Sequence, residues 1–175
     1  MKDPASRPVS EAEDPLLIDL FEASHVIPDL QAVSREAVIG EIVGQVASMG
    51  LVTDAKWLET ALTERERMVP TAMPNGVAFL HARHRAAEKF PRQFLFLARS
   101  VNGVQFGSPD ERPTHLFFLL ALRRDMAHLR WLARLSWICR NRNSIGPLFK
   151  ASTGAEVARL LRLAIEELPG NLRHR

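Results

Sequence analysis

The chain has 175 residues, of which 46% are hydrophobic and 25% are charged, and its net charge at pH 7 is +3. This composition is typical of one globular domain and excludes disordered, collagen-like and low-complexity chains. Its single cysteine, Cys139, excludes an internal disulfide scaffold, and the sequence has no Cys/His spacing of the kind found in zinc modules.

The sequence shows neither a secretory signal nor a membrane-spanning pattern. Residues 1–15 contain three prolines and several acids but no apolar signal core. The longest apolar run, Leu116–Leu122, has seven residues, whereas a membrane-spanning helix needs roughly 20. We therefore expect a soluble, cytoplasmic protein that does not insert into a membrane.

The charge is distributed unevenly along the chain. Residues 1–64 carry 4 basic and 12 acidic side chains, and residues 65–175 carry 19 basic and 8 acidic ones. The basic part suggests an anionic partner, such as nucleic acid, a phosphoryl group or an acidic protein surface. A solvated, arginine-rich surface without a partner explains the same charge equally well.

Composition also sets the predicted domain limits. Residues 1–14 are rich in proline, serine and acids that offer little to bury, so we expect a flexible leader. Residues 15–168 are expected to form a single domain, and residues 169–175 a C-terminal tail.

Two helices are predicted before the middle of the chain. Ser34 is a good N-cap for a helix with apolar residues at helical spacing up to Gly50. Thr53 is predicted to cap a second helix that ends near Arg67, because the prolines that follow forbid its continuation. The side chains expected to face the core in this second helix are Trp57, Ala61 and Leu62.

Three short apolar runs predict buried strands: Gly76–Leu80, Gln93–Ala98 and His115–Ala121. They do not alternate between apolar and polar residues, which is typical of a sheet that is covered on both faces. The predicted fold class is therefore α/β, a layered domain with a mixed, mostly buried sheet flanked by helices on both faces.

The helical period returns after Arg123, with Asp125 as the predicted N-cap of the next helix. The stripe expected to face the core in this helix is Leu129, Leu132, Leu135 and Cys139, with Trp131, Leu135 and Ile138 beside it. Thr153 and Glu156 form a T-x-x-E capping box, which predicts a closing helix up to Pro169.

The sequence contains six histidines, of which His81 is the strongest candidate for chemistry. It follows a predicted buried strand, and ligands collect at the carboxyl ends of strands in α/β sheets. Neutral imidazole is nucleophilic near pH 7, so His81 can accept a phosphoryl group, whereas a surface histidine in a loop is the simpler reading. A metal pair with His84 is disfavoured because further ligands are missing. We expect His25, His115 and His174 to be structural.

His128 is expected in the first turn of the helix that follows Asp125. Unsatisfied backbone N–H groups and the helix dipole favour an anion there, so this imidazole can donate to a phosphoryl oxygen. Its alternative is a packing residue over Leu132, four positions later.

The segment 65–83 closely resembles the active-site segment of the fructose/mannitol type of enzyme IIA of the phosphoenolpyruvate-dependent phosphotransferase system. The residues in register with the family pattern are Arg65, Glu66, Thr71, Asn75, Gly76, Ala78, His81 and Arg83. The segments Gln105–Gly107, Pro113–Leu120 and His128–Ala133 also resemble family blocks, and the likeness covers about residues 15–168. We expect no fused permease or carrier domain, and on that expectation the chain resembles the nitrogen-regulatory branch of the family.

The resemblance implies the fold of this family and a role for three residues. His81 would accept a phosphoryl group on Nε2 from the histidine-containing phosphocarrier protein, His128 would be the second active-site histidine, and Arg65 would be the active-site arginine. It implies no cofactor and no metal. The chain would be a phosphotransferase-system component rather than a free-standing metabolic enzyme, acting mainly in regulation, with a regulatory target protein or a sugar permease component as acceptor.

Three departures from the family pattern support an alternative. Leu80 replaces the proline before the histidine and Pro70 replaces a serine, while Pro74 stands where glycine-rich positions are common. Because proline fixes φ, these changes could reshape the loop that presents His81. The alternative is a protein-binding regulatory module that keeps the fold but is not phosphorylated.

The basic residues Arg123, Arg130 and Arg134 are predicted to share one helix face beside His128, where they could dock an acidic partner. An exposed, solvated face is the simpler explanation. Nucleic acid is not expected as a partner, because no recognition motif or aromatic platform accompanies the charge.

Overall fold

The computed structural model describes residues 15–83 and 86–173. Five strands of the described chain form one mixed sheet in the order β1-β4-β5-β3-β2. The strands are β1 (Val26–Ile27), β2 (Ala72–Met73), β3 (Val77–Leu80), β4 (Phe94–Val104) and β5 (Thr114–Ala121). β3 runs parallel to β5, and β1 runs parallel to β4, while the β4–β5 and β2–β3 pairs are antiparallel.

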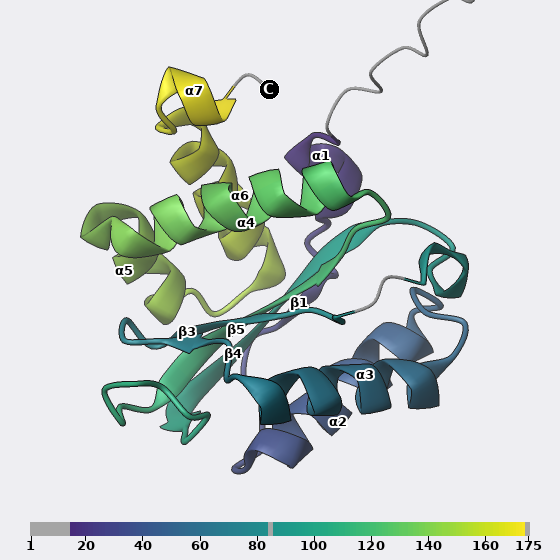
Figure 1. Cartoon of the computed structure of the whole chain (residues 1–175). Helices are drawn as coiled ribbons and strands as arrows, with labels where there is room; N and C mark the ends of the chain where they lie inside the picture. The colour runs from purple at the N-terminus through teal and green to yellow at the C-terminus, as the bar shows by residue number, and fades with distance from the viewer. Residues whose placement is uncertain (1–14, 84–85, 174–175) are drawn as a thin grey trace, which may run out of the picture.

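Helices cover both faces of this sheet. The helices are α1 (Leu17–Leu20), α2 (Arg35–Ser48), α3 (Ala55–Met68), the 3-10 helix η1 (Ala87–Lys89), α4 (Asp125–Arg140), α5 (Arg142–Lys150), α6 (Gly154–Glu166) and α7 (Gly170–Arg173). Figure 1 shows α2 and α3 below the sheet, and α4, α5 and α6 above it. The predicted layered α/β fold is therefore confirmed.

Each strand sends its side chains alternately into two cores. In β3, Ala78 and Leu80 face the core between the sheet and helices α2 and α3. Val77 and Phe79 face the core between the sheet and helices α4 and α6. All four side chains are buried. Burial on both faces explains why the strands read as continuous apolar runs rather than as alternating patterns.

The helix starts agree with the sequence at two of four places. The Ser34 hydroxyl accepts a hydrogen bond from the backbone N–H of Ala37, and the Thr153 hydroxyl accepts one from Glu156, as predicted. The predicted cap Thr53 is wrong, because the neighbouring Asp54 carboxylate caps α3 by accepting from the backbone N–H of Trp57.

The other wrong cap is Asp125, which is the first residue of α4, so that Arg124 stands at the N-cap position. The predicted core stripe of α4 is confirmed at Leu135 and Cys139 and is wrong at Leu129, which is exposed. Trp131 and Ile138, the residues predicted beside this stripe, are buried.

The domain limits 1–14, 15–168 and 169–175 stay predictions. The leader and His174 lie outside the described residues, as does His84. Residues 170–173 form α7, and Leu172 packs against the small core between α4 and α6. Within the described ranges, no helix has the length and apolar character that crossing a membrane requires.

Candidate functional site

His81 directly follows the last residue of β3. It lies at the end of the sheet where the parallel strand β5 also has its carboxyl end. Leu80 pairs with Leu119 of β5, which fixes the chain up to this point. The Nδ1 atom of the half-buried His81 lies 2.7 Å from the carbonyl oxygen of Phe79. A carbonyl oxygen only accepts, so Nδ1 carries the hydrogen and the neutral ring has its lone pair on Nε2. The fold therefore selects one tautomer of His81.

His128 meets His81 from the opposite side of the site. It lies in the first turn of α4 and is 5% exposed, and the centroids of the two imidazole rings are 5.1 Å apart. The rings are inclined by 59°, so they face each other without stacking. The first turn of a helix presents unpaired N–H groups and a positive dipole end, which favours an anion beside this pair. The structure thus brings the two predicted site histidines together, and their roles stay predictions.

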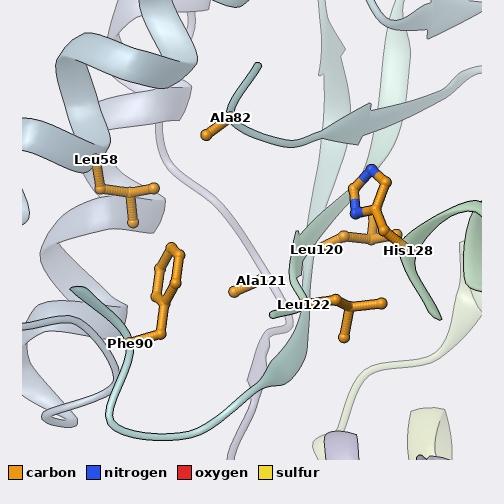
Figure 2. A pocket seen from close by; sticks show the side chains of 7 residues that line it. All are labelled: Leu58, Ala82, Phe90, Leu120, Ala121, Leu122 and His128. Atoms are coloured by element: carbon orange, nitrogen blue, oxygen red, sulfur yellow. The ribbon is translucent and has the colours of Figure 1, made fainter. Parts of the chain in front are cut away.

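A small pocket extends from His128 toward the other helical layer. Figure 2 shows the His128 ring above Leu120 and Leu122, with Leu58 and Phe90 across the pocket. The pocket volume is about 10 Å³, which is at the lower limit for one water molecule. This pocket is therefore too small to hold a small-molecule substrate.

Arg65 lies in the last turn of α3, where its guanidinium group is hydrogen-bonded to the backbone. Its Nη1 donates to the carbonyl oxygen of Val69 over 2.6 Å, which satisfies one of the last carbonyl groups of the helix. The Nη1 of Arg83 lies 3.5 Å from the sulfur of Met68, in the same turn. Since Arg83 follows His81 by two residues, the end of α3 lies beside the segment that leaves the histidine.

Sequence reasoning missed the role of Glu66. This carboxylate is 1% exposed and accepts hydrogen bonds from the backbone N–H of Thr71, at 2.9 Å, and from its hydroxyl, at 2.5 Å. Burial raises the pKa of Glu66, although the bonds from Thr71 oppose this shift. The bonds hold the turn between α3 and β2 closed. Glu66 and Thr71 both belong to the family pattern, but spacing alone does not reveal the bond.

The departures at positions 70 and 80 have clear positions in the fold. Leu80 is fully buried on the α2/α3 side of the sheet, where it contributes to the core. Pro70 is exposed and lies against Gly107, where an added Cβ would come within 3.0 Å of the proline ring and 2.5 Å of the Arg35 guanidinium. Gly107 also has a φ of 86°, so both space and backbone conformation require glycine in the Gln105–Gly107 block.

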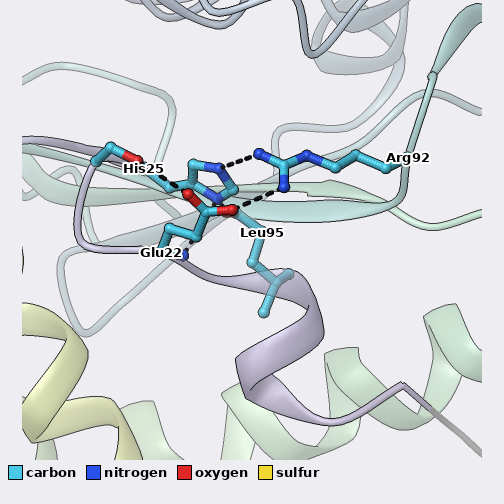
Figure 3. A network of polar contacts seen from close by, with 5 residues as sticks. Glu22, His25, Arg92 and Leu95 are labelled. Atoms are coloured by element: carbon cyan, nitrogen blue, oxygen red, sulfur yellow. Dashed lines mark hydrogen bonds and ion pairs between the residues drawn. The ribbon is translucent and has the colours of Figure 1, made fainter.

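His25 is a buried histidine far from this pair along the sheet order. Figure 3 shows its ring between Glu22, Arg92 and Leu95. Its Nδ1 lies 3.1 Å from the carbonyl oxygen of Leu95, and its Nε2 lies 3.4 Å from Nη2 of Arg92. Removal from water is the main cause that lowers the pKa of His25. His115 contacts the carbonyl oxygen of Ser100 through Nδ1, at 3.0 Å.

The described residues contain no cluster of three or more side chains suited to hold a metal ion.

The predicted arginine face of α4 differs from the structure. Arg134 is buried, donates from Nε to the carbonyl oxygen of Leu172, and lies over the Trp131 ring. Arg123 is exposed but binds the carbonyl oxygens of Phe90 and Pro91. The predicted uniform docking face is therefore wrong at Arg134, whose stem and head are used within the fold.

Comparison with known proteins places this geometry in a family. The family model described as "Phosphoenolpyruvate-dependent sugar phosphotransferase system, EIIA 2" matches residues 19–163. A nitrogen regulatory protein of Bradyrhizobium diazoefficiens is 28% identical over 142 residues, which cover 80% of this chain and 90% of that protein. The fructose-specific EIIABC component of Bacillus subtilis is 30% identical over 110 residues, 62% of this chain but only 17% of that longer protein.

Solved structures show the same fold at lower identity. The nitrogen regulatory protein IIA-Ntr of Neisseria meningitidis has a TM-score of 0.72 at 23% identity, over 81% of this chain and 96% of that one. The IIA mannitol structure of Escherichia coli has a TM-score of 0.69 at 21% identity, over 81% and 98%. The chain belongs to the EIIA type 2 family of the phosphoenolpyruvate-dependent sugar phosphotransferase system.

Proposed function

We propose that this protein is a phosphohistidine carrier that accepts a phosphoryl group on Nε2 of His81. The observation that carries the proposal is the bond from Nδ1 of His81 to Phe79, which keeps the nucleophilic lone pair on Nε2. The second imidazole, His128, is placed 5.1 Å away between ring centroids. Among the described residues, the pocket that reaches His128 is too small for a small-molecule substrate, which fits a donor presented by another protein.

The transfer step needs little acid–base chemistry. The Nε2 lone pair of His81 forms a bond to phosphorus while the nitrogen–phosphorus bond of the donor phosphohistidine breaks, and its electron pair returns to the donor ring. The Nδ1 hydrogen of His81 stays in place, and the Phe79 carbonyl stabilises the positive charge that develops on the ring. Catalysis of such a loose transfer consists of positioning and charge stabilisation.

Two donors are assigned to the phosphoryl oxygens. His128 would donate from its ring at the positive end of α4. Arg65 would supply its planar guanidinium, whose geometry matches phosphoryl oxygens. A guanidinium has five N–H donors, so its bond to Val69 holds the side chain at the end of α3 without using the whole donor set.

The proposed donor is the histidine-containing phosphocarrier protein, and the proposed acceptor is a regulatory target or a sugar permease component. The regulatory role is favoured because the chain aligns with 90% of a nitrogen regulatory protein. One solved structure of this fold is the complex of enzyme IIA-mannitol with phosphorylated enzyme IIB-mannitol from Escherichia coli, so a protein of this fold does bind a phosphorylated protein partner. We propose that the transfer takes place in the cytoplasm.

Intact-mass spectrometry tests the proposal. The protein is mixed with phosphoenolpyruvate, enzyme I and the phosphocarrier and kept at neutral or alkaline pH, because phosphohistidine is labile in acid. One added phosphoryl group is expected in the wild type and in the control His115→Gln, and none in His81→Ala. A phosphorylated His81→Ala protein would contradict the assignment.

The second candidate is a binding module that is not phosphorylated. It is favoured by the bond of Arg65 to Val69 and by Leu80, which replaces the family proline and is packed in the core. Absence of added mass in the wild type, with a conventional enzyme IIA phosphorylated in parallel, would select this candidate.

A further inference from the structure

The strand that carries His81 and the helix that carries His128 contact each other at two distant points. At one end, the two imidazole rings face each other. At the other end, Nδ2 of Asn75, which precedes β3, donates to the carbonyl oxygen of Cys139 near the end of α4, over 2.8 Å. Figure 1 shows α4 above the sheet. The helix begins on the side of the sheet where β3 ends, and it ends on the side where β3 begins. The helix thus contacts this segment at both ends, through the two imidazole rings at its start and through a hydrogen bond near its end.

The carbonyl of Cys139 needs this bond. It is one of the last four carbonyl groups of α4, which have no partner within their own helix. The N–H of Asn143, four residues later, donates instead to the side-chain oxygen of Asn141. Asn75 therefore caps the end of α4 from a remote part of the sequence.

Asn75 itself has a fixed position. The next residue, Gly76, has a φ of 77°, and its carbonyl oxygen accepts hydrogen bonds from the backbone N–H groups of His115 and Leu116, at 2.8 and 3.1 Å. These bonds attach the Asn75–Gly76 turn to the start of β5. The bond to Cys139 consequently joins the end of α4 to the sheet and not to a loose loop.

The amide of Asn75 is kept there at a cost. Its Oδ1 atom is buried and, among the described residues, has no hydrogen-bond partner. An unpaired buried acceptor destabilises a fold, and an apolar side chain of the same size would avoid this. The hydrogen bond from Nδ2 to the Cys139 carbonyl offsets this cost. The question is therefore what this bond holds in position.

We propose that Asn75 is a positioning residue for phosphoryl transfer, because it fixes the end of α4 and thereby the spacing between His128 and His81. The inference rests on the proposed function of His81. Eleven residues separate His128 from Cys139, about 16 Å of rigid helix, so a shift at one end is transmitted to the other. A displacement of 1 Å at a reacting group costs up to about 10²-fold in rate.

Two variants remove the bond in different ways. Asn75→Asp keeps the shape of the side chain but has no donor for the Cys139 carbonyl, and Asn75→Ala removes the amide without adding charge. The matched control is Thr153→Ala, which removes a helix cap of similar energetic weight from α6 without touching either histidine element. For each variant we would measure the unfolding midpoint, the single-turnover rate of transfer from the phosphorylated phosphocarrier, and the NMR contacts between the ring protons of His81 and His128.

Both Asn75 variants are expected to lose at least 10-fold in transfer rate and to weaken the contacts between the rings. Thr153→Ala is expected to lower the midpoint to a similar degree while rate and ring contacts stay as in the wild type. Unchanged rates and contacts in the Asn75 variants, or equal losses in Thr153→Ala, would overturn the proposal. If the wild type takes up no phosphoryl group, the proposed function fails, and the ring contacts alone still decide whether Asn75 sets the spacing.

Discussion

Nδ1 of His81 lies 2.7 Å from the carbonyl oxygen of Phe79, a residue of the strand that His81 itself extends. The acceptor is part of the backbone, so only a rotation of the His81 side chain itself breaks this contact. The nitrogen that we propose as the phosphoryl acceptor is thus selected by a backbone carbonyl group of β3.

This relationship predicts which nitrogen carries the phosphoryl group. In ¹⁵N-labelled protein at neutral pH, the neutral form of His81 is expected as the Nδ1–H tautomer, and after phosphorylation the two-bond ¹H–¹⁵N correlations are expected to place phosphorus on Nε2. The Nε2–H tautomer as the main form, or phosphorus on Nδ1, would contradict the assignment. His115, which also has a carbonyl oxygen at Nδ1, serves as an internal reference for the tautomer pattern.

The spacing between His81 and His128 predicts a rate effect without loss of the phosphorylation site. His128→Ala removes the second imidazole and is expected to slow transfer to His81 by about 10²-fold, the usual effect of removing one donor from a developing charge. His128→Gln keeps an N–H donor and should fall between the two. Rapid-quench measurements with phosphorylated phosphocarrier give these rates. An unchanged rate in His128→Ala would show that this ring is only a packing residue over the small pocket.

The sequence predicted the layers of the fold better than the limits of its elements. Continuous apolar runs identified β3, the first part of β4 and most of β5, because burial on both faces leaves no alternation. The predicted end of β4 at Ala98 is too early, since the strand continues through the charged residue Arg99 to Val104. Arg99 is accommodated because its guanidinium donates to the backbone carbonyl groups of Phe149 and Pro28, a long-range contact that no local pattern reveals.

The site shows the same division. His81 follows from its place after a buried strand, whereas the pairing with His128 depends on how α4 returns across the sheet, and only the family resemblance predicted it. The bonds of Arg65 to Val69 and of Asn75 to Cys139 involve backbone carbonyl groups at helix ends. Any residue type supplies such an acceptor, so sequence patterns carry no signal for these bonds.

The contacts of His25 predict a loss of stability in mild acid. Removal from water lowers the pKa of His25 below its ordinary value of 6.5, while Glu22 opposes the shift and Arg92 adds to it. As the pH falls through 6.5, the unfolded chain binds a proton that the folded ring does not, so the free energy of unfolding decreases until the folded pKa is reached. Phe21, Phe94 and Phe96 surround the ring and offer no replacement for water.

Denaturant unfolding between pH 5 and pH 8 tests this assignment. His25→Phe keeps an aromatic ring among the neighbouring phenylalanines but does not titrate, so its stability is expected to depend less on pH than that of the wild type. Glu22→Gln removes the charge that raises the pKa of His25, and is expected to lose more stability than the wild type between pH 6.5 and pH 5. Equal pH dependence in wild type and His25→Phe would assign the acid sensitivity to other groups.

The reactivity of the buried Cys139 thiol reports how often the last turn of α4 opens. Burial raises the pKa of this thiol to about 12, so at pH 8 only roughly 10⁻⁴ of it is thiolate, the form that reacts. Labelling by iodoacetamide at pH 8 is expected to be about 10³-fold slower in the folded protein than in denaturant, where the thiol regains its ordinary pKa. Mass spectrometry over time gives both rates. Rapid labelling of the folded wild type would mean that the last turn of α4 opens readily, which would also be incompatible with a rigid helix that sets the position of His128 from its far end.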